Sequence, residues 1–394
     1  MKPYYQDSAV QIFQGNSMTV LPQLDSQSVN CCVTSPPYWG LRDYGTSSRD
    51  GGDSECTHEP TQEWIDHNLN AKPAFGNGAG TQSAAAKKRW YKSDGSCPRC
   101  GAVRIDDQLG LESTPEEYVE KIVKVFSGVK RVLRDDGTLW LNLGDSYASG
   151  KGTCFNPGGG ESSLGKERKD AGVHPLDRGN KSTLAASGLK PKDLVGIPWR
   201  VAFALQADGW YLRSDIIWHK PNPMPESVTD RPTKSHEYIF LLSKGPKYYY
   251  DHEAIAEDSI GDYHGSRFDT GKTAIHQLNR SSGKTRVHGN LSGRSDGGGG
   301  CNKPNQDTRN KRTVWTVPTQ PLKAAHFATF PPDLIKPCIL AGCPKGGVVI
   351  DPFSGAGTSI MVAKERNRKG VGIELNPEYI EIAVKRLRQE VLAL

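Results

Sequence analysis

The chain has 394 residues, enough for one large α/β domain with insertions or for two domains. Its mean hydropathy is −0.59, and no run of about eighteen apolar residues occurs, which excludes a transmembrane helix. The net charge of +6 is compatible with a nucleic-acid partner, although many enzymes are equally basic.

The first half of the chain contains strand and helix patterns separated by turn signals. Residues 29–34 form a β-rich run that stops before Pro36-Pro37. A helix is expected over Pro115–Leu133, because Pro suits the first helical position, apolar residues recur at helical spacing and Asp135-Asp136-Gly137 is a stop signal. Residues 138–143 are then expected to form a strand.

The second half of the chain continues this alternation. Helices are expected at 193–207, 332–341, 358–366 and 377–394, and strands at 210–219, 237–242, 347–350 and 370–373. Strands that alternate with helices in this way predict an open α/β sheet with helices on both faces.

Three polar stretches, 45–108, 148–190 and 250–313, interrupt the alternation. We interpret them as insertions on one sheet, because structureless loops of this length are uncommon inside a compact domain. Most of the net charge lies in residues 262–312, which contain ten Lys and Arg against four Asp. This segment is also rich in Gly, Ser and Asn, so it fits a flexible surface loop as well as a nucleic-acid contact.

The segment Asp351–Thr358 has the features of a ligand-binding loop. It follows a predicted strand and opens a helix, and Gly355 and Gly357 permit a tight turn and close approach of a ligand to the backbone. Glu374 ends the next strand, where its carboxylate can accept hydrogen bonds from ribose hydroxyls. The dinucleotide fingerprint is not met, because Ile360 replaces its third glycine, and the Gly-Lys-Ser/Thr of a P-loop is absent.

The loop Ser35-Pro36-Pro37-Tyr38 suits the activation of an exocyclic base amine, whose lone pair is conjugated into the ring. Two acceptors, Ser35 Oγ and the Pro36 carbonyl, would draw the nitrogen toward tetrahedral geometry, and consecutive prolines fix that carbonyl in place. Tyr38 offers a face on which a flipped base can stack. In-line methyl transfer then requires positioning and no covalent intermediate. The structural alternative is a Pro-Pro turn after a buried strand.

Val33-Thr34-Ser35-Pro36-Pro37-Tyr38 resembles the signature of the N4-cytosine and N6-adenine DNA methyltransferases, and Asp351–Thr358 with Glu374 resembles their S-adenosylmethionine loop. The catalytic loop precedes the cofactor loop by about 316 residues, which is the permuted β arrangement of that family. The resemblance covers about two thirds of the chain. It implies a Rossmann-like methyltransferase fold and methyl transfer from S-adenosylmethionine to a flipped base of double-stranded DNA.

The resemblance also implies roles for single residues. The catalytic residues would be Ser35, Pro36, Pro37 and Tyr38. The cofactor would be bound by Asn16, Thr34, Phe327, Thr329, Asp351, Phe353, Ser354, Gly355, Gly357, Thr358, Glu374 and Asn376. Within this set, Phe353 packs on the cofactor, and Asn16 stands where many relatives have an Asp that contacts its adenine.

Two further stretches match the family. Ala325–Pro331, which holds Phe327 and Thr329, resembles the segment that closes over the methionine part of the cofactor. Trp218–Pro223, with Arg231 and His236-Glu237, resembles the stretch that supports the target-base pocket.

The identity of the base stays open between two amines. Ser at the first position of the tetrapeptide is more typical of N4-cytosine enzymes and Asp of N6-adenine enzymes, while the chemical problem is the same. We favour cytosine N4, with adenine N6 as the alternative. Cytosine-C5 enzymes attack with a Pro-Cys dipeptide after the cofactor loop, whereas Pro337-Cys338 precedes it here, so Cys338 is expected to be a buried helix residue.

Four residues predict a structural zinc site. Cys56-x-His58 and Cys97-x-x-Cys100 supply ligands of the right types, and Cys97–Gly101 resembles a zinc knuckle. The pairs are about 40 residues apart, long for a simple finger, so His67 is a spare candidate, and unrelated cysteines are the alternative. A redox role is disfavoured, because no strand precedes the Cys-x-x-Cys and no helix follows it directly.

These features give one expected organisation. The methyltransferase core would comprise 1–44, 109–249 and 314–394, with the zinc insertion at 45–108 and a DNA-recognition segment at 250–313. The N-terminus has no apolar export signal, so we expect a cytoplasmic protein, bacterial or phage-encoded, that acts as a monomer or homodimer. Alternatives are an RNA or protein methyltransferase and a non-catalytic nucleic-acid-binding protein, both disfavoured by the order and completeness of the two loops.

Overall fold

The computed structural model describes residues 1–40, 46, 48–53, 55–57, 96–105, 108–148, 154–155, 188–258, 308–320 and 329–389. The predicted site residues His58 and Phe327, and most of the predicted insertions, lie outside these ranges. The chain divides into two compact units, one of residues 1–251 with 313–394 and one of residues 252–312.

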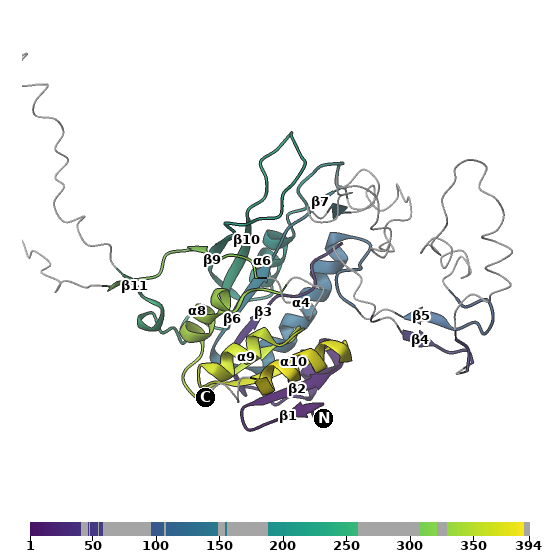
Figure 1. The fold of residues 1–394 in the computed structure, drawn as a ribbon, viewed down its shortest axis with the longest axis horizontal. Coiled ribbons are helices and arrows are strands. Elements are labelled where there is room, and N and C mark those ends of the chain that lie inside the picture. Colours follow the sequence, from purple (N-terminus) through teal and green to yellow (C-terminus); the bar gives the residue numbers. More distant parts are fainter. Residues whose placement is uncertain are drawn as a thin grey trace, which may run out of the picture. The chain divides into compact units, whose positions relative to one another are not determined.

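The first unit is built on a mixed sheet, whose nine strands within the described residues have the order β1-β2-β15-β14-β3-β6-β10-β9-β13. Figure 1 labels β1, β2, β3, β6, β9 and β10 of this sheet. The strands are β1 (Tyr5–Gln6), β2 (Val10–Gln14), β3 (Val29–Thr34), β6 (Leu133–Leu143), β9 (Tyr211–His219), β10 (His236–Ser243), β13 (Val314–Thr316), β14 (Val348–Asp351) and β15 (Lys369–Glu374). The run from β2 to β6 is parallel, whereas β10 is antiparallel to both of its neighbours. The predicted α/β class is confirmed.

The helices of this unit form two groups, and the helices within each group contact one another. One comprises α1 (Ser17–Val20), η1 (Leu21–Gln23), α4 (Pro115–Val132) and α6 (Ile197–Ala207), and the other α8 (Pro332–Gly342), α9 (Thr358–Glu365) and α10 (Pro377–Gln389). No helix in the described part of the chain combines the length and apolar character needed to cross a bilayer.

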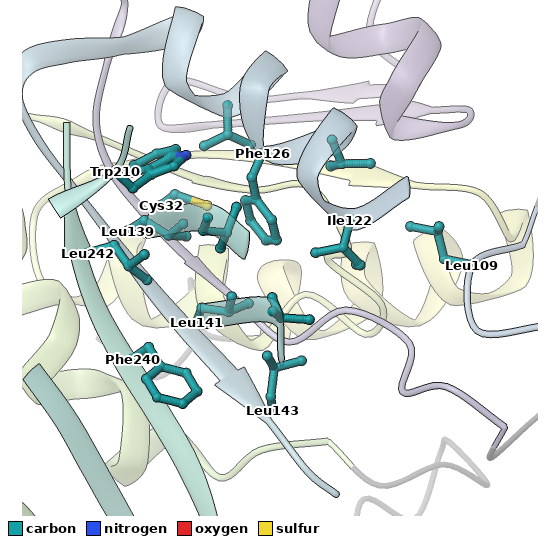
Figure 2. Close-up of a cluster of buried hydrophobic side chains, with 14 of the residues drawn as sticks. Cys32, Leu109, Ile122, Phe126, Leu139, Leu141, Leu143, Trp210, Phe240 and Leu242 are labelled. Carbon is teal, nitrogen blue, oxygen red and sulfur yellow. The ribbon is translucent and has the colours of Figure 1, made fainter. Parts of the chain in front are cut away.

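Alternation along β6 shows why both faces of the sheet are covered. Leu139, Leu141 and Leu143 join the hydrophobic cluster that includes the buried face of α4, as Figure 2 shows. Trp140, between these leucines, points to the opposite face of the sheet, as successive residues of a strand do. There its ring lies against α8, where a Cβ on Gly342 would be 2.4 Å from Trp140 Nε1. Successive side chains of one strand thus pack on different helix groups, which confirms the predicted helices on both faces.

Helix α4 illustrates how the sequence sets an element's ends. Thr114 caps it by accepting a hydrogen bond from Glu117 N at 3.2 Å, and Pro115 occupies the first turn. Its buried residues Tyr118, Ile122 and Phe126 recur at helical spacing. This helix leads directly into β6.

Some predicted bounds were wrong. The helix expected from 193 begins at Ile197, because Gly196 has φ +78° and ends the preceding loop. Strand β6 begins at Leu133 instead of 138. The sequence reading missed β1, β2 and β13, of which β2 pairs in parallel with β15 beside the cofactor loop.

Short strand pairs lie outside the main sheet. Within the first unit, β4 (Ser48–Asp50) pairs with β5 (Val103–Ile105) and β7 (Tyr147–Ala148) with β8 (Cys154–Phe155). The second unit contains η3 (Glu253–Ile255) and the pair of β11 (Glu257–Asp258) and β12 (Thr308–Arg309). There Glu257 binds Arg309 Nε at 3.1 Å and Arg312 Nε at 2.6 Å.

Candidate active site

The two predicted loops follow neighbouring strands. β3 and β14 are parallel and pair through Cys31 and Cys32, so their carboxyl ends meet at one edge of the sheet. Thr34 is the last residue of β3 and Asp351 the last residue of β14. At this edge Thr34 Oγ1 donates a hydrogen bond of 2.6 Å to Asp351 Oδ1. Both side chains are buried. One hydrogen bond therefore joins the start of the catalytic loop to the start of the cofactor loop.

Asp351 is the centre of a buried network. Its carboxylate also accepts hydrogen bonds from Phe353 N at 3.0 Å and from Ser359 Oγ. Burial raises the pKa of Asp351 to about 6, and the hydrogen bonds oppose that shift. With these three donors the carboxylate fixes the loop from both of its ends, which is a positioning role.

Two glycines shape the cofactor loop. Gly355 has φ +50° and Gly357 φ +76°, conformations that favour glycine. A Cβ on Gly355 would meet no atom within 4 Å, so the backbone is open to a ligand there. A Cβ on Gly357 would lie 2.8 Å from Ala383 Cβ, so this glycine also lets α10 pack closely on the start of α9.

Glu374 faces this loop from the end of β15. Its Oε2 accepts a hydrogen bond from Gly355 N at 2.8 Å and its Oε1 accepts one from Asn376 N at 2.9 Å. Burial raises the pKa of Glu374 to about 7. Each carboxylate oxygen keeps a further lone pair, which suits a vicinal diol that donates two hydrogen bonds.

Other predicted cofactor residues have local structural partners. Asn16 Oδ1 caps α1 by accepting from Met18 N at 2.9 Å, and Asn376 Oδ1 accepts from Glu378 N at 2.9 Å. Ser354 N binds Ile373 O at 2.9 Å, and Thr358 Oγ1 accepts from Arg386 Nη1 at 3.0 Å. Thr329 is partly buried just before α8. Their contacts with a cofactor stay predictions.

The catalytic loop is held from several sides. Tyr118 on α4 donates a hydrogen bond of 2.9 Å to the carbonyl of Pro37, and Gly40 N binds Gly110 O at 2.9 Å. Trp39 Nε1 donates to the carbonyl of Glu112 at 2.9 Å. Pro36 is buried, while Ser35 and Tyr38 are partly exposed.

Tyr38 has a fixed orientation. Its hydroxyl lies 3.1 Å from Asn142 Oδ1, 2.9 Å from Glu237 Oε2 and 3.3 Å from Ser35 Oγ. Its ring lies against Gly144, where a Cβ would come within 2.5 Å of Tyr38 Cε2. Burial and then the charge of Glu237 raise the pKa of the Tyr38 hydroxyl well above its ordinary value, so it stays a hydrogen-bond donor.

A cation completes this network. Lys220 Nζ pairs with Glu237 Oε1, and both side chains are largely buried. The same ammonium lies 4.2 Å from the centre of the Trp218 ring. The predicted pocket-supporting stretch thus lies next to the catalytic tetrapeptide through Glu237 and Lys220.

The sulfur atoms of Cys56, Cys97 and Cys100 lie within 4.8 Å of one another, a spacing compatible with one metal ion. Backbone hydrogen bonds from Ala102 and then Asp53 lower the pKa of Cys100 to about 7. His58, the fourth predicted ligand, lies outside the described residues. Cys338 is a buried helix residue, as predicted, with its thiol directed to Leu334 O.

The sequence reading missed several residues around the site. Ser17 Oγ donates to the carbonyl of Pro352 and so holds the cofactor loop from α1. Asn142, Gly144 and Ser359 contact the two loops directly. The available signal was the stretch Asn142-Leu143-Gly144-Asp145 at and just after the end of β6, because polar residues at the carboxyl end of a buried strand point to a site.

Comparisons with known proteins agree with this geometry. A family model described as "DNA methylase" (N6_N4_Mtase) matches residues 29–385. The Type II methyltransferase M.Cfr9I of Citrobacter freundii is 40% identical over 385 residues, which cover 96% of this chain and 88% of that protein. M.SmaI of Serratia marcescens is 39% identical over 376 residues, with coverages of 95% and 90%.

Among solved structures, the fold matches PvuII DNA methyltransferase (cytosine-N4-specific). The TM-score is 0.53 at 15% identity, over 98% of this chain and 88% of that one, so the two share a fold. Because the family model spans most of the chain and full-length relatives are about 40% identical, the chain belongs to the N6/N4 DNA methylase family and is a DNA methyltransferase.

Proposed function

We propose that the protein transfers a methyl group from S-adenosylmethionine to the exocyclic N4 amine of cytosine at specific sites in double-stranded DNA. The observation that carries this proposal is the 2.6 Å hydrogen bond between Thr34 and Asp351. It fixes the tetrapeptide that suits amine activation beside the loop that suits a cofactor. A displacement reaction needs this fixed relative position of its two reactants.

The residues of the cofactor loop fit S-adenosylmethionine. Glu374 would accept hydrogen bonds from the ribose hydroxyls, the open backbone at Gly355 would border the cofactor, and Phe353 would pack on it. When bound, the cofactor supplies a methyl group on a sulfonium, which is an electrophile without further activation. The chain's own contribution is therefore to orient the amine and to exclude water.

The tetrapeptide would prepare the amine. Ser35 Oγ and the Pro36 carbonyl would accept the two amino hydrogens and localise the nitrogen lone pair, and Tyr38 would contact the flipped base. Hydrogen bonds from the Tyr38 hydroxyl to Asn142 and Glu237 fix the orientation of the ring before the base binds. Binding of the base therefore does not have to pay for ordering this side chain.

We favour cytosine over adenine for two reasons. The tetrapeptide begins with Ser35 in place of Asp, and the chain shares its fold with PvuII DNA methyltransferase, a cytosine-N4-specific enzyme. Adenine N6 is the alternative, since both amines pose the same chemical problem.

We also propose that residues 252–312 contact DNA phosphates, in line with the basic composition of that segment. Methylation of an amine by a sulfonium needs no Lewis acid, so any metal at the cysteine cluster would serve structure.

The proposal is tested with purified protein, labelled S-adenosylmethionine and unmethylated duplex DNA that is digested to nucleosides after the reaction. We expect the label in N4-methylcytosine. Label in N6-methyladenine would change the proposed target base from cytosine to adenine and leave the proposed catalytic site unchanged. Label only in RNA or protein would overturn the proposed function.

A further inference from the structure

The pairing of β4 with β5 brings two turns of the chain together, although about 40 residues separate them. Each turn is closed by its own backbone hydrogen bonds. In the first, Cys56 N binds Asp53 O at 3.1 Å. In the second, Gly101 N binds Cys97 O at 2.9 Å and Cys97 N binds Ala102 O at 2.8 Å. Both turns therefore hold their cysteines in defined positions.

The turns are also packed against each other. Gly52 has φ +76°, and a Cβ there would lie 2.7 Å from Cys100 Sγ and 2.8 Å from Ala102 Cβ. Only glycine fits this contact without displacing the second turn. The sequence thus provides the close approach that brings Cys56 to Cys97 and Cys100.

The sulfur positions match one coordination sphere. Cys56 Sγ and Cys97 Sγ are 3.9 Å apart, and all three sulfurs lie within 4.8 Å of one another. Two thiolates on a tetrahedral zinc ion, with Zn–S bonds of about 2.3 Å, are separated by roughly 3.8 Å. A disulfide would need an S–S distance of about 2.05 Å, and none of the three cysteines forms a disulfide.

The surroundings explain why an ion would be useful here. Among residues 50–53, 55–57 and 96–103, whose burial the structure describes, the buried hydrophobic residues are only Cys97 and Ala102. A pair of three-residue strands with so little apolar core needs another source of stability.

We infer that Cys56, Cys97 and Cys100 are three ligands of a structural tetrahedral Zn²⁺ site that ties the two turns together. Two thiolate-bearing turns facing one ion are typical of zinc ribbons. A tetrahedral ion takes one further ligand beyond these three. Because only the folded turns bring the three sulfurs together, the ion would bind the folded chain and stabilise it by the free energy of binding.

The segment that carries the three cysteines begins and ends beside the catalytic loop. The insertion leaves the core at Gly40 and returns at Gly110, whose backbone groups are hydrogen-bonded at 2.9 Å. A Cβ on Gly110 would lie 2.9 Å from the carbonyl oxygen of Tyr38. The zinc-bound turns therefore belong to a segment that is anchored at both ends next to the tetrapeptide.

The test uses the full-length protein purified without chelators and measures its metal content by mass spectrometry. We expect about one zinc ion per chain. Replacement by Co²⁺ should give the strong near-ultraviolet sulfur-to-cobalt absorption and the visible bands of tetrahedral cobalt. This spectrum is read on the wild-type chain and does not depend on whether any variant folds.

Variants then identify the ligands. Cys56→Ser, Cys97→Ser and Cys100→Ser should each lose most of the zinc, while the matched control Cys301→Ser should keep it. Wild-type protein without stoichiometric metal, full zinc retention in the three ligand variants, or a disulfide between two of these cysteines in the protein as isolated would each overturn the inference.

Discussion

The loop after β14 is supported mainly by residues close to it in sequence, with Thr34 and Ser17 as its distant partners, whereas Tyr38 in the loop after β3 is supported by residues far away. Asp351 binds Phe353 and Ser359 within eight positions, and Glu374 reaches the loop from 19 positions on. Tyr38, by contrast, binds Asn142 and Glu237 across 104 and 199 positions.

This difference separates two tasks. Cofactor binding depends mainly on backbone shape and one carboxylate, which β14, its loop, α9 and the following strand β15 together supply. Positioning a flipped base depends on side chains that only the assembled sheet brings together. Changes in the two loops should therefore affect different measured quantities.

The largest effect is expected for Ser35→Ala. Loss of one of the two acceptors on the amine should lower the single-turnover rate of methyl transfer by about 100-fold or more, in the range seen when one preorganised hydrogen-bonding group is removed from an active site. The affinity for S-adenosylmethionine, measured by calorimetry, should stay nearly unchanged. Exposed Ser28 provides the control Ser28→Ala. A collapse of cofactor binding in Ser35→Ala would contradict the division between the loops.

A smaller effect is expected for Gly144→Ala, which changes no catalytic group. The new Cβ would lie 2.5 Å from Tyr38 Cε2, so the ring must move. We expect the rate of transfer to fall roughly 10- to 100-fold, the scale of a displacement of about 1 Å. Gly245→Ala is the matched control, since its Cβ would make only ordinary contacts. An unchanged rate in Gly144→Ala would show that the orientation of Tyr38 is not required.

The smallest effect concerns pH. Because the pKa of Glu374 is raised to about 7, the carboxyl is mostly protonated at pH 6 and ionised at pH 8. The ionised form is the better acceptor and attracts a sulfonium, so affinity for S-adenosylmethionine should rise up to about ten-fold over this interval. Glu374→Gln should bind more weakly at pH 8 and show no such rise. A wild-type affinity that falls with pH would contradict this assignment.

The raised pKa of Glu374 also affects the stability of the cofactor-free protein, which should change with pH in the opposite direction to cofactor affinity. Between the ordinary pKa of 4.5 and the folded value of about 7, the folded protein holds a proton that the unfolded chain has lost. The free energy of unfolding of the cofactor-free protein should therefore decrease as pH rises through this window. Glu374→Gln should remove that part of the pH dependence, as measured by denaturant titration.

The contrast between the loops also explains what the sequence could predict. Asp351–Thr358 and Glu374 carry local signals, namely a strand, two glycines, a helix start and an acid at the next strand end, and the elements around them were predicted nearly to the residue. The tetrapeptide at Ser35 was recognisable, but the partners of Tyr38 were not, because nothing near residue 38 indicates Asn142 or Gly144.

The fold shows the same limit. Periodicity predicted α4, α8 and α10 because each buries one regular face, but it could not give the strand order of the sheet. The short strands β1 and β13, of two and three residues, are too brief to show a period of two and depend on their neighbours for formation. The three cysteines were predicted as ligands, while the pairing of β4 with β5 that brings them together was not.

The central claim is that this chain methylates cytosine N4 in DNA through the loop at Ser35. The most direct measurement needs no knowledge of the recognition sequence: the gene is expressed in a bacterial host that lacks its own N4-methylcytosine, and the genomic DNA is digested and analysed by mass spectrometry. We predict N4-methylcytosine with the wild-type chain and none above background with Ser35→Ala. N6-methyladenine in its place, or equal N4-methylcytosine from the variant, would contradict the claim.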